Sequence, residues 1–140
     1  MTKPTLCLAA LAAIAICPFG AAAAGGPVVL ELNKLEPAGE AGGCQAFVLI
    51  ENGAGAMESL NVDLVMMDPE GVIARRLAVE LGPLRAGKTS VKVFRVDGVE
   101  CGRIGGVLLN DVIGCAPAPE AGDCFALVST RARGAVAFYE

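Results

Sequence analysis

The sequence of 140 residues contains no histidine and no tryptophan, and it contains only one tyrosine. Without histidine, the chain cannot assemble a Ser–His or Cys–His nucleophile from its own residues. It also lacks a C-x-x-C pair, which disfavours a thioredoxin-like dithiol, and a zinc site would need four widely spaced cysteines. We therefore expect a protein that is not an enzyme and has no catalytic residues and no cofactor.

Positive charge is also scarce, because the chain has 11 Lys+Arg against 15 Asp+Glu and a formal net charge of −4. This balance argues against a nucleic-acid partner and against a basic membrane-binding patch. Arg75, Arg76, Arg131 and Arg133 could form a small basic patch. A solvated strand face is the favoured interpretation of these four arginines.

An unbroken apolar run covers residues 6–16, and Lys3 is the only charged residue before the small residues that end near position 24. This pattern predicts a secretory signal helix over 1–24 that is cleaved off and leaves one domain over 25–140. No twin-arginine pair is present, which favours a Sec-type route. We expect a periplasmic or secreted protein with no membrane span after cleavage.

Two other interpretations of the N-terminus are weaker. Pro18 and Gly20 interrupt the hydrophobic stretch, which disfavours a permanent membrane anchor. A lipid-modified Cys17 is disfavoured because Ile16, and not a small residue, precedes it.

The rest of the chain consists of short apolar runs separated by Gly, Pro, Asn and Asp, with no sustained helical repeat. In the run 28–35, alternation places Val28, Leu30 and Leu32 on one face and Glu31 and Asn33 on the other. In the run 60–67 it places Asn61 and Asp63 on the solvent face. The segment Asp68–Gly71 predicts a tight turn, with Gly71 in a left-handed conformation. The partner strand over 72–81 should then direct Ile73, Leu77 and Val79 inward.

About seven strands are expected in total, and their turn signals are fairly evenly spaced. They cover residues 28–35, 44–51, 60–67, 72–81, 88–96, 104–113 and 125–130, with a final short segment at 136–139. The pattern predicts an all-β fold, an immunoglobulin-like antiparallel β-sandwich. A small β-barrel is the structural alternative.

Four cysteines follow the signal, namely Cys44, Cys101, Cys115 and Cys124, and they allow three pairings. In an immunoglobulin-like order the second and fifth strands are antiparallel, so Cys44 and Cys101 should lie side by side. Cys115 ends the sixth strand and Cys124 begins the seventh. We therefore expect the disulfides Cys44–Cys101 and Cys115–Cys124, although the other two pairings stay open.

Met57, Met66 and Met67 offer soft sulfur ligands of the kind that Cu(I) prefers, and Asp63 could pair with Asp68 or Glu70. Core packing is the favoured interpretation of the methionines. A solvated face and a turn account for the acidic residues. We expect no metal site at either place.

Several motifs carry a resemblance that runs through the chain after the signal. They are Leu30-Glu31-Leu32-Asn33, Cys44 with Asn52-Gly53, the run Leu60 to Met67, Asp68-Pro69-Glu70-Gly71-Val72, and Leu81-Gly82-Pro83-Leu84 with Gly87-Lys88-Thr89. In this order the chain resembles a family of small exported proteins of Gram-negative bacteria, often labelled "Tat pathway signal sequence domain protein". The middle portion is also similar in layout to FxLYD-type immunoglobulin-like domains. The resemblance implies export and an immunoglobulin-like fold, and it lends no activity or site residues.

The function expected from the sequence is that of a non-enzymatic exported protein. We expect a protein–protein interaction or structural module whose partner is another envelope protein. A small-ligand or metal-binding periplasmic module is the alternative.

Overall fold

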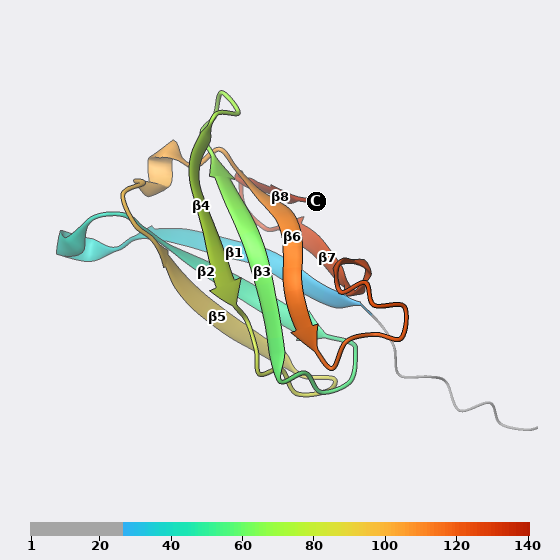
Figure 1. Cartoon of the computed structure of the whole chain (residues 1–140). Coiled ribbons are helices and arrows are strands. Elements are labelled where there is room, and N and C mark those ends of the chain that lie inside the picture. The colour runs from blue at the N-terminus through green and yellow to red at the C-terminus, as the bar shows by residue number, and fades with distance from the viewer. Residues whose placement is uncertain (1–26) are drawn as a thin grey trace, which may run out of the picture.

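The computed structural model describes residues 27–140, so the expected signal helix and Cys17 lie outside the described residues. Eight strands form two packed four-stranded sheets (Figure 1). The strands are β1 (Val28–Pro37), β2 (Cys44–Asn52), β3 (Ser59–Met67), β4 (Ile73–Glu80), β5 (Thr89–Val96), β6 (Gly106–Ala116), β7 (Val128–Ala132) and β8 (Ala137–Tyr139). Three short 3-10 helices lie between them: η1 (Gly39–Ala41), η2 (Cys101–Arg103) and η3 (Phe125–Leu127). The predicted all-β sandwich is confirmed.

The first sheet has the order β5-β2-β1-β7 and the second has the order β4-β3-β6-β8. Strands β2 and β5 pair antiparallel, as expected of the second and fifth strands of an immunoglobulin-like order. The sheets are mixed, however, because β7 pairs parallel with β1 and β8 pairs parallel with β6. The end of the chain thus adds a strand to each sheet, which corrects the expectation of about seven antiparallel strands.

The core lies between the sheets and is built from alternate residues of the central strands. On β1 these are Val28, Leu30 and Leu32, which are 4% exposed or less. The inward face of β3 carries Leu60, Val62, Leu64 and Met66. The alternation of the sequence therefore identified the buried face of both strands correctly.

The β3–β4 hairpin closes as the sequence predicts, but β4 enters it out of phase. Gly71 has a φ of 82°, and Asp68 and Val72 are joined by a backbone hydrogen bond of 2.8 Å. A β-bulge then shifts the register, so that Ile73 lies opposite Met67. Ile73 consequently faces solvent and is 67% exposed, which makes the prediction that it points inward wrong.

The two disulfides are Cys44–Cys101 and Cys115–Cys124, which is the pairing favoured from the sequence. The first joins the start of β2 to η2, and the second joins the end of β6 to the residue before η3. Both therefore fasten a connecting segment to a core strand. No helix within residues 27–140 is long and apolar enough to cross a membrane.

Candidate functional site

The acidic residues considered as a catalytic pair do not form one. Asp63 is only 3% exposed, and its carboxylate accepts hydrogen bonds from Arg76 and Asn110 at 2.6 to 3.1 Å. These contacts, the bond from Arg76 first, hold the pKa of Asp63 below its usual value. Asp68 instead caps its own turn by accepting from the backbone N–H groups of Glu70 and Val72. The prediction that Asp63 is solvated is wrong, because a neighbouring strand covers it.

The methionines occupy different places. Met57 and Met66 are 4% and 0% exposed and belong to the core. The Met67 sulfur accepts a hydrogen bond of 3.5 Å from the Tyr139 hydroxyl. No group of three or more His, Cys, Asp or Glu residues within 27–140 is arranged to hold a metal ion.

The four arginines considered as one patch lie on different sheets. Arg76 belongs to β4, at the edge of the second sheet, and is paired with Asp63 at 2.7 Å. Arg131 belongs to β7, at the opposite edge of the first sheet, and Arg133 follows it. Both are paired with Glu31. Three of the four arginines are therefore parts of two separate ion-pair networks, and Arg75 belongs to neither.

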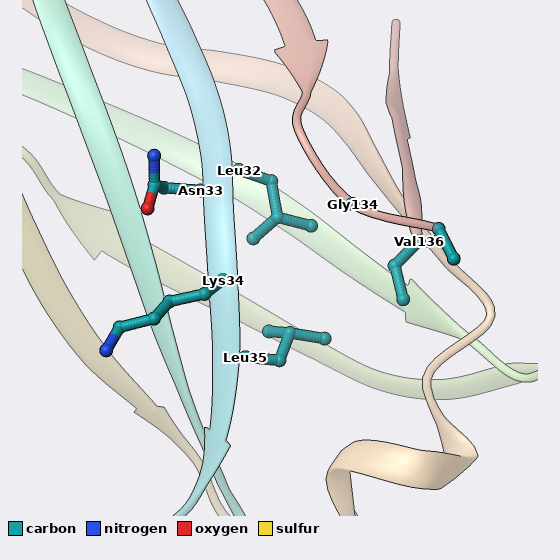
Figure 2. A pocket seen from close by; sticks show the side chains of 7 residues that line it. Leu32, Asn33, Lys34, Leu35, Gly134 and Val136 are labelled. Atoms are coloured by element: carbon teal, nitrogen blue, oxygen red, sulfur yellow. The ribbon is translucent and has the colours of Figure 1, made fainter.

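A largely apolar hollow lies between β1 and the segment that joins β7 to β8. It has a volume of about 260 Å³ and is lined by Leu32, Asn33, Lys34, Leu35, Gly134, Ala135 and Val136. Figure 2 shows the side chains of Leu32 and Leu35 directed toward Val136, whereas Asn33 and Lys34 point to the other side of β1. We call this hollow the β1 groove.

The β1 groove exists because β7 is shorter than β1. Strand β7 pairs only with residues Val28 to Leu32, and a last hydrogen bond of 3.0 Å joins the Arg133 N–H to the Leu32 carbonyl. The chain then crosses to the other sheet to form β8, while β1 continues to Pro37. From Asn33 to Pro37, no described strand pairs with this edge of β1.

A bulge in β1 sorts the side chains on either side of the β1 groove. The register with β2 shifts between Leu32 and Lys34, so that Lys34 lies opposite Phe47 and Leu35 lies opposite Ala46. The Lys34 ammonium group sits 4.4 Å from the centre of the Phe47 ring, on the outer face of the sheet. Leu35 faces the interior and packs against the core. The β1 groove is therefore apolar although two of its neighbours are polar.

An ion-pair network fixes the point where β7 leaves β1. Glu31 is 3% exposed, and its carboxylate accepts hydrogen bonds from Asn33 at 3.0 Å, Arg133 at 3.0 Å and Arg131 at 2.7 Å. Arg131 also reaches Glu51 of β2 at 2.6 Å. Strand alternation places Glu31 on the outer face. It does not predict that Arg131 and Arg133, which follow 100 and 102 positions later, cover the Glu31 carboxylate.

These bonds also set the acidity of Glu31. The hydrogen bonds from Asn33, Arg133 and Arg131, in that order of effect, lower the pKa of Glu31 to about 2. Glu31 therefore stays ionised at any physiological pH.

Comparisons with protein-family models, with curated proteins and with solved structures found no match for this chain.

Proposed function

We propose that this chain is a non-enzymatic protein of the cell envelope that binds an extended segment of another envelope protein in the β1 groove. The secretory pattern of the first residues and the two disulfides support an oxidising compartment outside the cytoplasm. The observation that carries the proposal is the unpaired edge of β1 beside an apolar hollow.

The chemistry of binding follows from that arrangement. An added strand can hydrogen-bond to the backbone of Asn33–Pro37, continuing the sheet where β7 leaves it. Every second side chain of the added strand then points toward the core side, where Leu32, Leu35 and Val136 form the wall. The bound segment should therefore carry an aliphatic residue of moderate size at that position.

The test uses the mature domain with a photo-crosslinking amino acid in place of Ala135, an exposed residue that lines the β1 groove. The same amino acid in place of Ala86, in the exposed loop before β5, is the matched control. Irradiation in envelope extract should link a discrete protein to position 135 and not to position 86.

A tryptophan substitution adds the loss-of-function arm. Ala135→Trp should fill the mouth of the β1 groove and suppress the crosslinked product from a probe at exposed Gly134, whereas Ala86→Trp should leave it unchanged. A product that forms equally at positions 135 and 86, or that survives Ala135→Trp, would contradict the proposal. Circular dichroism spectra of all variants establish that they remain folded.

A further inference from the structure

Positive charge is concentrated in one stretch of this acidic chain. Between Gly71 and Val96 there are six Lys or Arg residues and one acidic residue, Glu80. The rest of the chain holds five Lys or Arg residues and fourteen Asp or Glu residues. The net charge of −4 therefore conceals a cationic segment within an anionic molecule.

The fold places this segment along one side of the sandwich. It forms β4 and β5, which are the edge strands of the two sheets and contact each other. Figure 1 shows them together on the side away from β7 and β8, and hence away from the β1 groove. Residues 27–140 include five cations without an ion-pair partner, namely Arg75, Arg85, Lys88, Lys92 and Arg103, and four of these belong to this segment.

The outer edge of β5 is open along its whole length. Strand β5 pairs with β2 on one side, and no described strand pairs with the other. Its side chains alternate, so that Val91 and Val93 face outward and are 58% and 44% exposed. Opposite them on β2 lie Leu49 and Phe47, which are half-buried and extend the apolar strip.

The other face of β5 carries the charge. Lys92 lies opposite Val48, a core residue, so its side chain starts on the inner face at the open edge. The Glu80 carboxylate already accepts hydrogen bonds from Leu60, Ser59 and Gly82, which outweigh its burial and lower its pKa, and the charge of Lys92 adds only a smaller effect without forming an ion pair. Lys92 therefore retains the capacity to bind a second carboxylate.

We propose that the open edge of β5 binds an extended acidic segment of a partner protein as an additional strand. Its backbone completes the hydrogen bonding of β5, and its apolar residues lie against Val91 and Val93. Its acidic residues, on the opposite face, meet Lys92 and the flanking Lys88. This surface does not depend on the β1 groove, so either can fail without the other.

A second copy of this chain fits the β5 edge poorly. The stretch Thr89–Val96 contains Lys92 and Arg95 and no carboxylate. Arg95 is paired with Asp97, but Lys92 has no ion-pair partner among the described residues, so pairing β5 with itself brings unpaired Lys92 charges together. Lysine on an edge strand is a common device that prevents such self-pairing. The same charges that repel a second β5 attract an acidic strand, which is what selects the partner.

The test uses a fluorescent peptide as long as β5, eight residues, with valine and glutamate alternating. N-methylation of the backbone on one edge prevents the peptide from pairing with itself. A second peptide has lysine in place of glutamate, and a third is N-methylated on both edges. Binding to the mature domain is followed by fluorescence anisotropy at increasing salt concentration.

We expect only the singly methylated glutamate peptide to bind, with an affinity that falls as salt is added. Lys92→Glu should weaken this binding by about tenfold and favour the lysine peptide instead. Arg103→Glu makes the same change in net charge at a cation in η2, outside β4 and β5, and should leave binding unchanged. Because the salt series uses the wild-type protein, it tests the charge dependence even if a variant fails to fold.

Three outcomes would overturn the proposal. Equal binding of the glutamate and lysine peptides would remove the charge selection. Binding of the doubly methylated peptide would show a cationic patch without strand addition. Displacement of the singly methylated glutamate peptide by a single-stranded oligonucleotide of equal charge would show the same. Dimers of the free domain that Lys92→Glu abolishes would show that β5 serves self-association.

Discussion

Glu31 connects the last strand of the first sheet to its neighbours through a single carboxylate. Its oxygens accept from Asn33 on its own strand and from Arg131 and Arg133 at the end of β7. These bonds lower its pKa from 4.5 to about 2. Because the pKa is lower in the folded state, the ionised carboxylate stabilises the fold above about pH 4.5, and this contribution disappears as the pH falls toward 2.

We expect Glu31→Gln to lower the melting temperature at neutral pH, because glutamine is uncharged and leaves Arg133 without its ionic partner and Arg131 with Glu51 alone. The difference from the wild-type protein should shrink as the pH falls from about 4.5 to about 2. Thermal unfolding followed by circular dichroism across this range measures it. Glu120→Gln, on an exposed loop, controls for the loss of one negative charge. A difference that stays constant with pH would contradict the assignment.

The burial of Asp63 and Glu31 could not be predicted from the sequence, although the face of the strand on which each lies could. Alternation placed both on the outer face correctly, since their neighbours Val62, Leu64 and Leu32 are in the core. It could not show that long arginine side chains from adjacent strands lie over them. Burial of an outward residue depends on which strand becomes its neighbour, and that information is absent from a single strand's pattern.

At the scale of elements, the two disulfides constrain loops of different length. Cys44–Cys101 joins residues 57 positions apart, whereas Cys115–Cys124 joins residues nine apart. The longer loop loses more conformational freedom in the unfolded chain when it is closed. The first bridge should therefore contribute more to stability than the second.

We expect replacement of both Cys44 and Cys101 by alanine to lower the free energy of unfolding by about 4 kcal/mol. Replacement of both Cys115 and Cys124 should lower it by about 3 kcal/mol. Urea titration of the two double variants measures both values. A larger loss for the Cys115–Cys124 pair would show that its bridge holds structure beyond its own loop.

The positions of the strands, including the two short ones near the end, could be predicted from the sequence, but the pairing of the short strands could not. Alternating runs identified β1 and β3, and turn chemistry placed Gly71 in the hairpin. Strands β7 and β8 have only five and three residues, which is too short for alternation to reveal their partners. Their parallel pairing, and with it the β1 groove, depends on contacts between distant parts of the chain.

The positions of the methionine sulfur atoms and of the other possible metal ligands bear on the alternative that the protein is a metal-binding module. Met57 and Met66 are in the core, and Met67 accepts a hydrogen bond from Tyr139 on β8. We expect the melting temperature to be unchanged by Cu(I), Zn²⁺ or Ca²⁺, since no described cluster offers a site. Differential scanning fluorimetry measures this, with a chelator as the control. A rise of several degrees with one ion, reversed by the chelator, would favour the alternative.

The order of the strands along the chain determines when the edge of β1 can be paired. Strand β1 lies near the start of the described chain, and the arginines that close its edge lie 100 residues later. In a polypeptide that emerges with its N-terminus first, the edge of β1 that later pairs with β7 therefore stays unpaired until almost all of the chain has appeared. Strand β7 then pairs with Val28–Leu32 only, which is the first half of this edge. The β1 groove is thus the part of that edge that stays open after β7 has paired, and no strand within residues 27–140 occupies it.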